Sequence, residues 1–209
     1  MPSQSEHTIF VVDDDQAVRE SLRWLLESVG HQVQTYPSAT AFLNAYEPGR
    51  SGCLLLDVRM PGMSGLELQE VLNQRQVDIP VIIITGHGDV PMAVQAMKAG
   101  AMEFIEKPFN DQILIDRVQA CLDRATARYQ RQQARSEILQ RASRLTPRER
   151  EVLDAVVSGK PNKIIADDLS ISIKTVEIHR ARSMEKMQAG SLAELVSMCI
   201  EAGIHEGKP

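Results

Sequence analysis

The stretch Leu54-Leu55-Leu56-Asp57-Val58-Arg59-Met60-Pro61-Gly62 decides the fold of this chain. A run of three leucines is typical of a strand that is buried on both faces. The run ends at a carboxylate, and the Pro61-Gly62 and Ser64-Gly65 pairs that follow are turn residues. We therefore expect Asp57 at the carboxyl end of a strand, which is where open α/β sheets bind their ligands.

Similar apolar segments recur along residues 1–122 and alternate with helical patterns. Strands are predicted at residues 9–12, 33–36, 54–56, 80–84 and 102–105. Helical spacing of apolar residues follows each of them. Five strands that alternate with five helices predict an α/β domain with a parallel sheet and right-handed crossovers.

Polar side chains stand at the ends of these strands. Asp13 and Asp14 follow the first strand, Asp57 the third, Thr85 the fourth and Lys107 the fifth. Each alone has an ordinary role, such as a helix cap, a strand end or a solvated cation. Because the carboxyl ends of parallel strands share one edge, all five should converge. Three clustered carboxylates repel one another and need a cation, and hard oxygen ligands with open positions suit Mg²⁺.

The length of 209 residues allows one large domain or two small ones. No apolar run approaches the roughly 18 residues of a membrane span, and the N-terminus has no pattern of a secretory signal. Cys53, Cys121 and Cys199 lie far apart in apolar surroundings, which favours small core residues in a reducing compartment. We expect a cytoplasmic protein without a membrane partner.

Charge is distributed unevenly along the chain. Residues 1–122 carry 16 acidic and 8 basic groups, residues 123–145 carry 2 and 6, and residues 146–209 carry 10 and 9. We interpret these as an acidic domain (1–122), a basic helical linker (123–145) and a nearly neutral tail domain (146–209). The linker arginines could face DNA or form a solvated helix face. Its apolar residues are too few to establish a coiled coil.

The tail domain is predicted to contain four helices. Residues 146–149, Thr-Pro-Arg-Glu, form a capping box, and that first helix ends at Gly159. The second helix begins at Asn162 or Lys163, and the turn 170–172 leads into the third, with Ser172 as its cap. Residues 191–194, Ser-Leu-Ala-Glu, form another capping box for the fourth. Two short helices joined by a tight turn indicate a helix-turn-helix.

The third tail helix divides into two faces on a helical wheel. The side suited to packing gathers Val176, His179, Ser183, Met184 and Met187. The opposite side, which a DNA major groove could receive, gathers Lys174, Glu177, Ile178, Ala181, Arg182 and Glu185. Arg180 falls nearer the packed side, so its stem would have to snorkel toward a phosphate.

The set of Asp13, Asp14, Asp57, Thr85 and Lys107 resembles the receiver domain of two-component response regulators, a flavodoxin-like (βα)5 fold with strand order 2-1-3-4-5. Residues 86–91 (Gly-His-Gly-Asp-Val-Pro) and 103–109 (Glu-Phe-Ile-Glu-Lys-Pro-Phe) resemble the FixJ branch closely. Residues 161–187 resemble the LuxR-type helix-turn-helix, including Asn-Lys-Ile-Ile-Ala at 162–166 and Lys-Thr-Val-Glu-Ile-His at 174–179. The resemblance covers essentially the whole chain.

The resemblance to receivers implies a phosphoryl switch. Asp57 would accept a phosphoryl group from a sensor histidine kinase. Mg²⁺ (or Mn²⁺) would be held by Asp14, Asp57 and the backbone carbonyl of Arg59, with Asp13 acting through water. The Lys107 ammonium and the metal would neutralise charge on the transferred group.

The same resemblance implies a conformational readout. Thr85 would hydrogen-bond a phosphoryl oxygen, and Phe104 would turn into the space that Thr85 vacates. The surface of the fourth helix and fifth strand would then form a phosphorylation-dependent dimer contact. The face is more apolar than a solvated helix needs, although part of it must be core; it consists of Val90, Met92, Val94 and Met97.

The resemblance to LuxR-type domains implies binding to promoter DNA, through paired half-sites in a dimer. Three residues would face base edges: Glu177, Ile178 and Ala181. Six would contact phosphates: Lys163, Lys174, Thr175, Arg180, Arg182 and Lys186. Residues 174–188 carry four basic and two acidic groups, but the neutral tail as a whole also fits a helical protein-interaction module. RNA polymerase is a further partner that such a regulator could contact.

Two other classes of function remain as alternatives to a phosphorylation-controlled transcription factor. An aspartyl-phosphate hydrolase would use Asp57 as a turnover nucleophile, but it needs a substrate pocket and a second acid, and we find no cap domain to build one. For that reason we expect no enzyme activity. A phosphorylation-gated adaptor would bind a protein through the tail, and DNA binding by the tail would exclude it.

Overall fold

The computed structural model describes residues 7–47, 49–86 and 88–204, so His87 of the segment quoted above lies outside the described residues. The chain divides into two compact units, Met1–Tyr129 and Gln130–Pro209. We describe each unit by itself. In the described ranges, no helix is long and apolar enough to cross a membrane.

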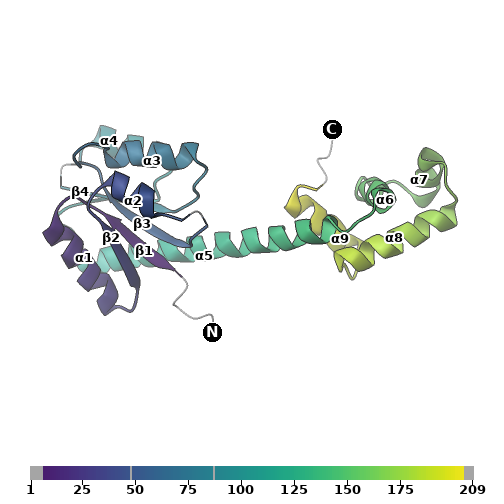
Figure 1. Ribbon diagram of the computed structural model, residues 1–209, viewed down its shortest axis with the longest axis horizontal. Helices are drawn as coiled ribbons and strands as arrows, with labels where there is room; N and C mark the ends of the chain where they lie inside the picture. Colours follow the sequence, from purple (N-terminus) through teal and green to yellow (C-terminus); the bar gives the residue numbers. More distant parts are fainter. Residues whose placement is uncertain (1–6, 48, 87, 205–209) are drawn as a thin grey trace. The chain divides into compact units, whose positions relative to one another are not determined.

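The first unit contains a five-stranded sheet with the order β2-β1-β3-β4-β5, and every pair is parallel (Figure 1). The strands are β1 (Thr8–Val12), β2 (Gln32–Tyr36), β3 (Gly52–Asp57), β4 (Val81–Thr85) and β5 (Glu103–Glu106). The predicted fold class and strand order are confirmed. The register pairs Asp57 with Ile84, so the ends of β3 and β4 lie side by side.

Helices cover both faces of this sheet. They are α1 (Gln16–Ser28), α2 (Ala39–Ala45), α3 (Gly65–Gln74), α4 (Val90–Lys98) and the first part of α5 (Asp111–Ala142). Leu54 and Leu56 pack in one apolar cluster with residues of α2, α3 and α4, whereas Leu55 packs in another with α1 and α5. Figure 1 shows these two layers. The leucine run is therefore a strand buried on both faces, as expected.

The second unit contains α6 (Pro147–Val157), α7 (Asn162–Leu169), α8 (Ile173–Met187) and α9 (Leu192–Ala202) within the described residues. The capping box at Thr146 and the Ser172 cap are confirmed. The second predicted box is only half formed. Ser191 accepts from the backbone N–H of Glu194, but the Glu194 carboxylate accepts from Gly190 N, at 2.8 Å, because that N–H precedes the helix and is within its reach.

The end of α5 belongs to the core of this second unit. Ile138 and Ala142 are buried in one cluster with residues of α6, α8 and α9. Arg135 Nε donates to the carbonyl of Ala202, at 3.3 Å, near the end of α9. α5 ends at Ala142, inside the range 123–145 that the sequence predicts for the linker.

Candidate functional site

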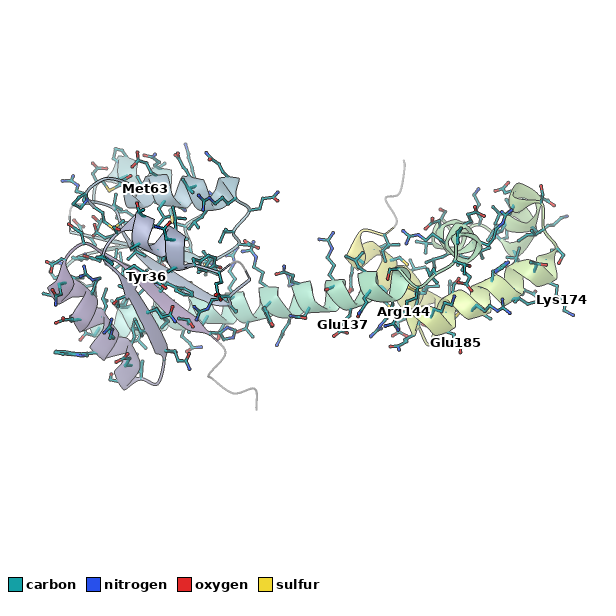
Figure 2. All side chains as sticks on the ribbon, in the orientation of Figure 1. Tyr36, Met63, Glu137, Arg144, Lys174 and Glu185 are labelled. Atoms are coloured by element: carbon teal, nitrogen blue, oxygen red, sulfur yellow. The ribbon has the colours of Figure 1, made fainter. Side chains whose placement is uncertain are left out.

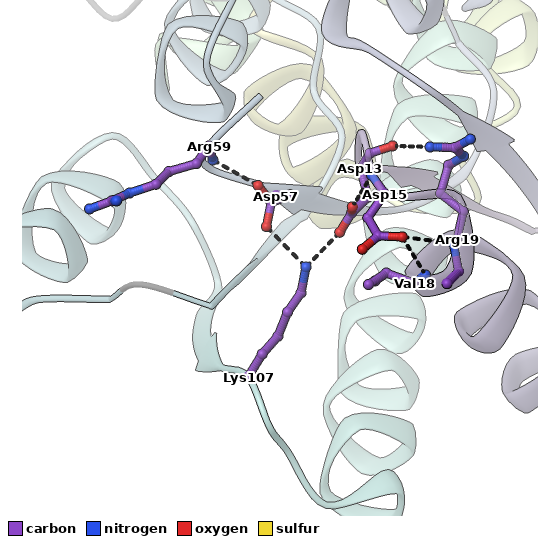
Figure 3. A network of polar contacts seen from close by, with 8 residues as sticks. Asp13, Asp15, Val18, Arg19, Asp57, Arg59 and Lys107 are labelled. Carbon is purple, nitrogen blue, oxygen red and sulfur yellow. Dashed lines mark hydrogen bonds and ion pairs between the residues drawn. The ribbon is translucent and has the colours of Figure 1, made fainter. Parts of the chain in front are cut away.

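Lys107 joins two carboxylates that lie 94 and 50 residues away in the sequence. Its Nζ donates to Asp13 Oδ2 at 2.6 Å and to Asp57 Oδ1 at 3.0 Å (Figure 3). Both carboxylates are buried, with Asp13 3% and Asp57 7% exposed. The position follows from the fold, since the three residues stand at the carboxyl ends of β1, β3 and β5. Side-chain hydrogen bonds of Lys107 thus join three of the five predicted residues directly.

The backbone that follows each strand fixes the other carboxylate oxygen. Asp57 Oδ2 accepts from the Arg59 N–H at 2.7 Å, and Asp13 Oδ1 accepts from the Asp15 N–H at 2.9 Å. These are Asx turns, in which an aspartate hydrogen-bonds the backbone two residues ahead. Arg19, which the sequence analysis missed, donates from Nη1 to the Asp13 carbonyl at 2.7 Å (Figure 3). The two carboxylates are therefore positioned before any ligand arrives.

Burial and the second carboxylate set the electrostatics of this edge. Burial raises the pKa of Asp57; the hydrogen bond and charge of Lys107 oppose the rise, and Asp13 adds to it. Burial also disfavours the charge of Lys107, but the hydrogen bonds to Asp13 and Asp57 outweigh that effect and raise its pKa. One ammonium thus serves two buried carboxylates, and its charge does not fully compensate theirs.

The remaining two predicted residues sit differently. Thr85 ends β4 and is 1% exposed, whereas Asp14 is exposed and lies outside the Lys107 hydrogen bonds. Among the described residues, no three His, Cys, Asp or Glu side chains gather closely enough to hold a metal ion. The donors that are assembled nevertheless fit a hard cation in type. They are carboxylate oxygens of Asp13 and Asp57, both of which accept from the Lys107 ammonium. Carboxylate oxygens are the ligands that hard cations prefer.

The predicted dimer face divides into core and surface. Met92 packs against the buried cluster beneath α4, so it belongs partly to the core. Val90, Val94 and Met97 are 76%, 46% and 46% exposed. Phe104 of β5 is half-buried and packs against the same cluster as Met92.

The predicted faces of α8 match its burial. Val176, Ser183 and Met187 are buried in the unit. The side predicted to face DNA is exposed, and Figure 2 shows Lys174 near the start of the helix and Glu185 near its end. The exposed residues are Lys174, Glu177, Ile178, Ala181, Arg182 and Glu185.

Other predicted phosphate contacts are placed less simply. Lys163 of α7 is exposed and Thr175 is half-buried. Arg180 is half-buried, and its Nη1 donates to Asn162 Oδ1 at 3.3 Å. Lys186 Nζ donates to Glu149 Oε2 at 2.6 Å and to the Arg144 carbonyl at 3.2 Å. The ammonium of Lys186 is therefore already engaged within the unit.

Glu149 is the centre of a polar network that the sequence analysis did not foresee. The side chain is 4% exposed, and it accepts from Lys186 and from the Thr146 N–H, at 2.9 Å. These hydrogen bonds, that of Lys186 first, lower the pKa of Glu149 to about 2. Ser183 Oγ donates to the Glu149 carbonyl at 3.1 Å, so two contacts join α6 to α8. The only sequence signal was the capping box, which explains the contact with Thr146 but neither of the contacts with α8.

Three of the six linker arginines also have partners inside the molecule. Arg128 forms an ion pair with Asp78 in the first unit, and Arg141 forms one with Glu137, at 3.5 Å, in the second. Together with Arg135 on Ala202, they make the linker less available to DNA than a free basic face would be.

Two family models match the chain in the same order as its two units. Residues 9–119 match the response regulator receiver domain. Residues 143–199 match the bacterial regulatory proteins of the luxR family.

Similar proteins and structures cover nearly the whole chain. The transcriptional regulatory protein FixJ of Azorhizobium caulinodans is 53% identical over 94% of this chain and 93% of its own length. The structure of response regulator StyR is 47% identical, with a TM-score of 0.83 over 94% of this chain and 100% of that one. Full-length FixJ from B. japonicum is 42% identical, with a TM-score of 0.57 over 96% and 98%.

Proposed function

We propose how this protein works from one premise: the chain belongs to the FixJ-like response regulators, transcription regulators that join a receiver domain to a LuxR-type DNA-binding domain. The receiver implies a sensor kinase as partner, and the LuxR-type domain implies DNA. We propose that Asp57 is the phosphoacceptor and that its phosphorylation controls dimerisation and promoter binding.

One observation carries the assignment of Asp57. Its carboxylate is buried at the carboxyl edge of the sheet, and Lys107 reaches it and Asp13 with one ammonium. In the reaction, a carboxylate oxygen of Asp57 forms a bond to phosphorus as the bond to the kinase's histidine nitrogen breaks. Negative charge on the transferred oxygens is then met by Lys107, which the fold holds in place beforehand.

Receiver domains generally bind Mg²⁺ at the phosphorylation site. In this chain we propose that Asp14, Asp57 and the Arg59 carbonyl would hold it, with Asp13 acting through water. The ion would supply further positive charge to the phosphoryl oxygens. Mn²⁺ has the same preference for oxygen ligands.

The output steps follow the same proposal. Phosphorylation adds about −1.5 to −2 charges at the strand edge. Thr85 then hydrogen-bonds the phosphoryl group, and Phe104 turns toward the space it leaves. The apolar Val90, Val94 and Met97 would meet a second copy of the chain. Two copies bind paired half-sites in promoter DNA, through α8.

We propose further that the protein acts in the cytoplasm, where its DNA lies, and that it contacts RNA polymerase at the promoter. We also propose that Asp57 is a switch rather than a turnover nucleophile, so that the protein is not an enzyme. Asp57 should therefore release its phosphoryl group slowly, and the protein should not hydrolyse an added phosphoester through repeated turnovers.

The experiment that tests this function is labelling of the full chain with acetyl phosphate and Mg²⁺. Wild-type protein should take up one phosphoryl group, dimerise and bind promoter fragments more tightly. Asp57→Asn should take up none, because the amide is not a nucleophile. Exposed Asp111→Asn is the matched control and should label normally. One equivalent of label on Asp57→Asn would place the acceptor elsewhere.

A further inference from the structure

Gly88, in the loop between β4 and α4, lies directly against the ring of Phe104. A Cβ built on Gly88 would stand 2.9 Å from Cε1 and 3.1 Å from Cζ of that ring. Carbon atoms in favourable contact are about 3.5–4.0 Å apart, so any side chain here would overlap the ring. The same Cβ would stand 3.5 Å from Cγ2 of Thr85. Gly88 thus borders both residues of the proposed readout.

Glycine is needed at this position because any side chain would overlap the Phe104 ring, and not because of the backbone conformation. Gly88 is not among the residues with positive φ, so an alanine could adopt its backbone. Gly86, in the same loop, also lacks a positive φ, and a Cβ built on it would meet nothing within 4 Å. The two glycines therefore differ in their contact with Phe104, which makes Gly86 a natural control.

We propose that the Phe104 ring packs against Gly88 in the unphosphorylated protein, and we call this contact the seat of the ring. We propose further that the seat opposes dimerisation until phosphorylation moves the ring. The proposal rests on the proposed function, in which Phe104 turns toward Thr85. Gly88 acts through Phe104 and is a positioning residue. Nothing in the phosphoryl transfer itself requires it.

The geometry also gives the direction of the effect. The overlapping atoms belong to the free end of the Phe104 side chain. The ring would therefore rotate away from residue 88 before the backbone of the strands shifted. A change that destabilises one of two positions raises the population of the other. Gly88→Ala should therefore favour the displaced ring, and with it the dimer, in the absence of phosphate.

NMR of the full chain tests the seat directly. The protein would carry ¹³C-labelled phenylalanine rings, and Phe104→Leu would identify the Phe104 signals among the four phenylalanines. In Gly88→Ala these signals should move toward the position that they take in wild type with Mg²⁺ and beryllofluoride, a phosphoryl analogue. In Gly86→Ala they should stay. Unmoved signals in Gly88→Ala, or equal movement in both variants, would overturn the proposal.

Sedimentation of the same variants tests the consequence. Without beryllofluoride, Gly88→Ala should raise the dimer association constant about tenfold, as overpacking of a well-filled site predicts. Gly86→Ala should leave it unchanged. The double variant Gly88→Ala/Phe104→Leu should return to the value of Phe104→Leu alone, because the shorter side chain removes the overlap. A dimer constant in Gly88→Ala no higher than wild type contradicts the proposal.

The two readouts separate this inference from the proposed function. If wild-type protein does not dimerise with beryllofluoride, the proposed dimerisation fails. The phenylalanine spectra of the unphosphorylated variants would still decide whether Gly88 seats the ring.

Discussion

Each unit of this molecule holds a lysine that reaches a buried carboxylate at 2.6 Å, and the two sites behave in opposite ways. Lys186 meets Glu149, which also accepts a backbone N–H, and the pKa of Glu149 falls to about 2. Lys107 must serve both Asp13 and Asp57, and the pKa of Asp57 is raised by burial in spite of it. A fully compensated carboxylate stabilises a domain. An incompletely compensated one is ready to accept a cation or an electrophile.

We expect the largest difference between the two lysines in the rate of phosphoryl transfer to Asp57. Lys107→Met should slow labelling of Asp57 by acetyl phosphate about 100-fold, since it removes a fixed cation from the developing charge. Lys186→Met should leave the labelling rate unchanged. Stopped-flow or time-course labelling of the full chain measures both, and equal rates in wild type and Lys107→Met would contradict the assigned role.

Lys186→Met should instead reduce stability. We expect the helical unit to lose about 2 kcal/mol, because Glu149 keeps its burial but loses its cation, while water reaches part of the Lys186 side chain. Urea denaturation followed by circular dichroism measures the loss. Lys163→Met, on an exposed part of α7, is the control and should change stability little. If both variants are equally stable, the Glu149 network does not hold α6 to α8.

The Glu149 network also predicts a dependence on pH. Its pKa is depressed from the ordinary 4.5 to about 2, so its contribution is present above pH 4.5 and is lost as pH falls toward 2. About 2 kcal/mol of stability should disappear over that window after allowance for screening at Lys186. Glu149→Gln should flatten the slope of unfolding free energy against pH there. An unchanged slope would assign acid sensitivity to other groups.

The smallest effect concerns DNA. Arg182→Ala should weaken promoter binding by about 1 kcal/mol and reduce the salt slope by about one phosphate contact. Phosphorylation should be unaffected, because the residue lies in the other unit. Arg131→Ala, on the exposed linker, separates the alternatives left open by the sequence: an equal loss there would show that the linker also contacts DNA. Fluorescence anisotropy across a salt series measures both.

Sequence reasoning succeeded where periodicity and topology determine position. Buried parallel strands bring their ends to one edge, so Asp13, Asp57 and Lys107 could be placed together from residues far apart. The two faces of α8 were also predictable, because they depend on a helix period alone. The site roles of these residues remain predictions for experiment.

Sequence reasoning could not foresee contacts between helices that meet only in three dimensions. A wheel of α8 shows that Lys186 carries charge, but not that Glu149 of α6 receives it. The Glu194 carboxylate accepts from the Gly190 N–H, not from the Ser191 N–H that the capping-box pattern predicts. The contact between Phe104 and Gly88 likewise depends on the path of the loop between β4 and α4, which a sequence pattern does not determine.

The burial of Ile138 and Ala142 has a practical consequence for dissecting the protein. A truncated gene that starts at Thr146 would encode α6 to α9 with these two side chains missing from beneath them. The exposed apolar surface would invite self-association that has nothing to do with signalling. A fragment beginning at Gln130 keeps Ile138 and Ala142 in that core. It is therefore the better choice for footprinting the isolated DNA-binding unit.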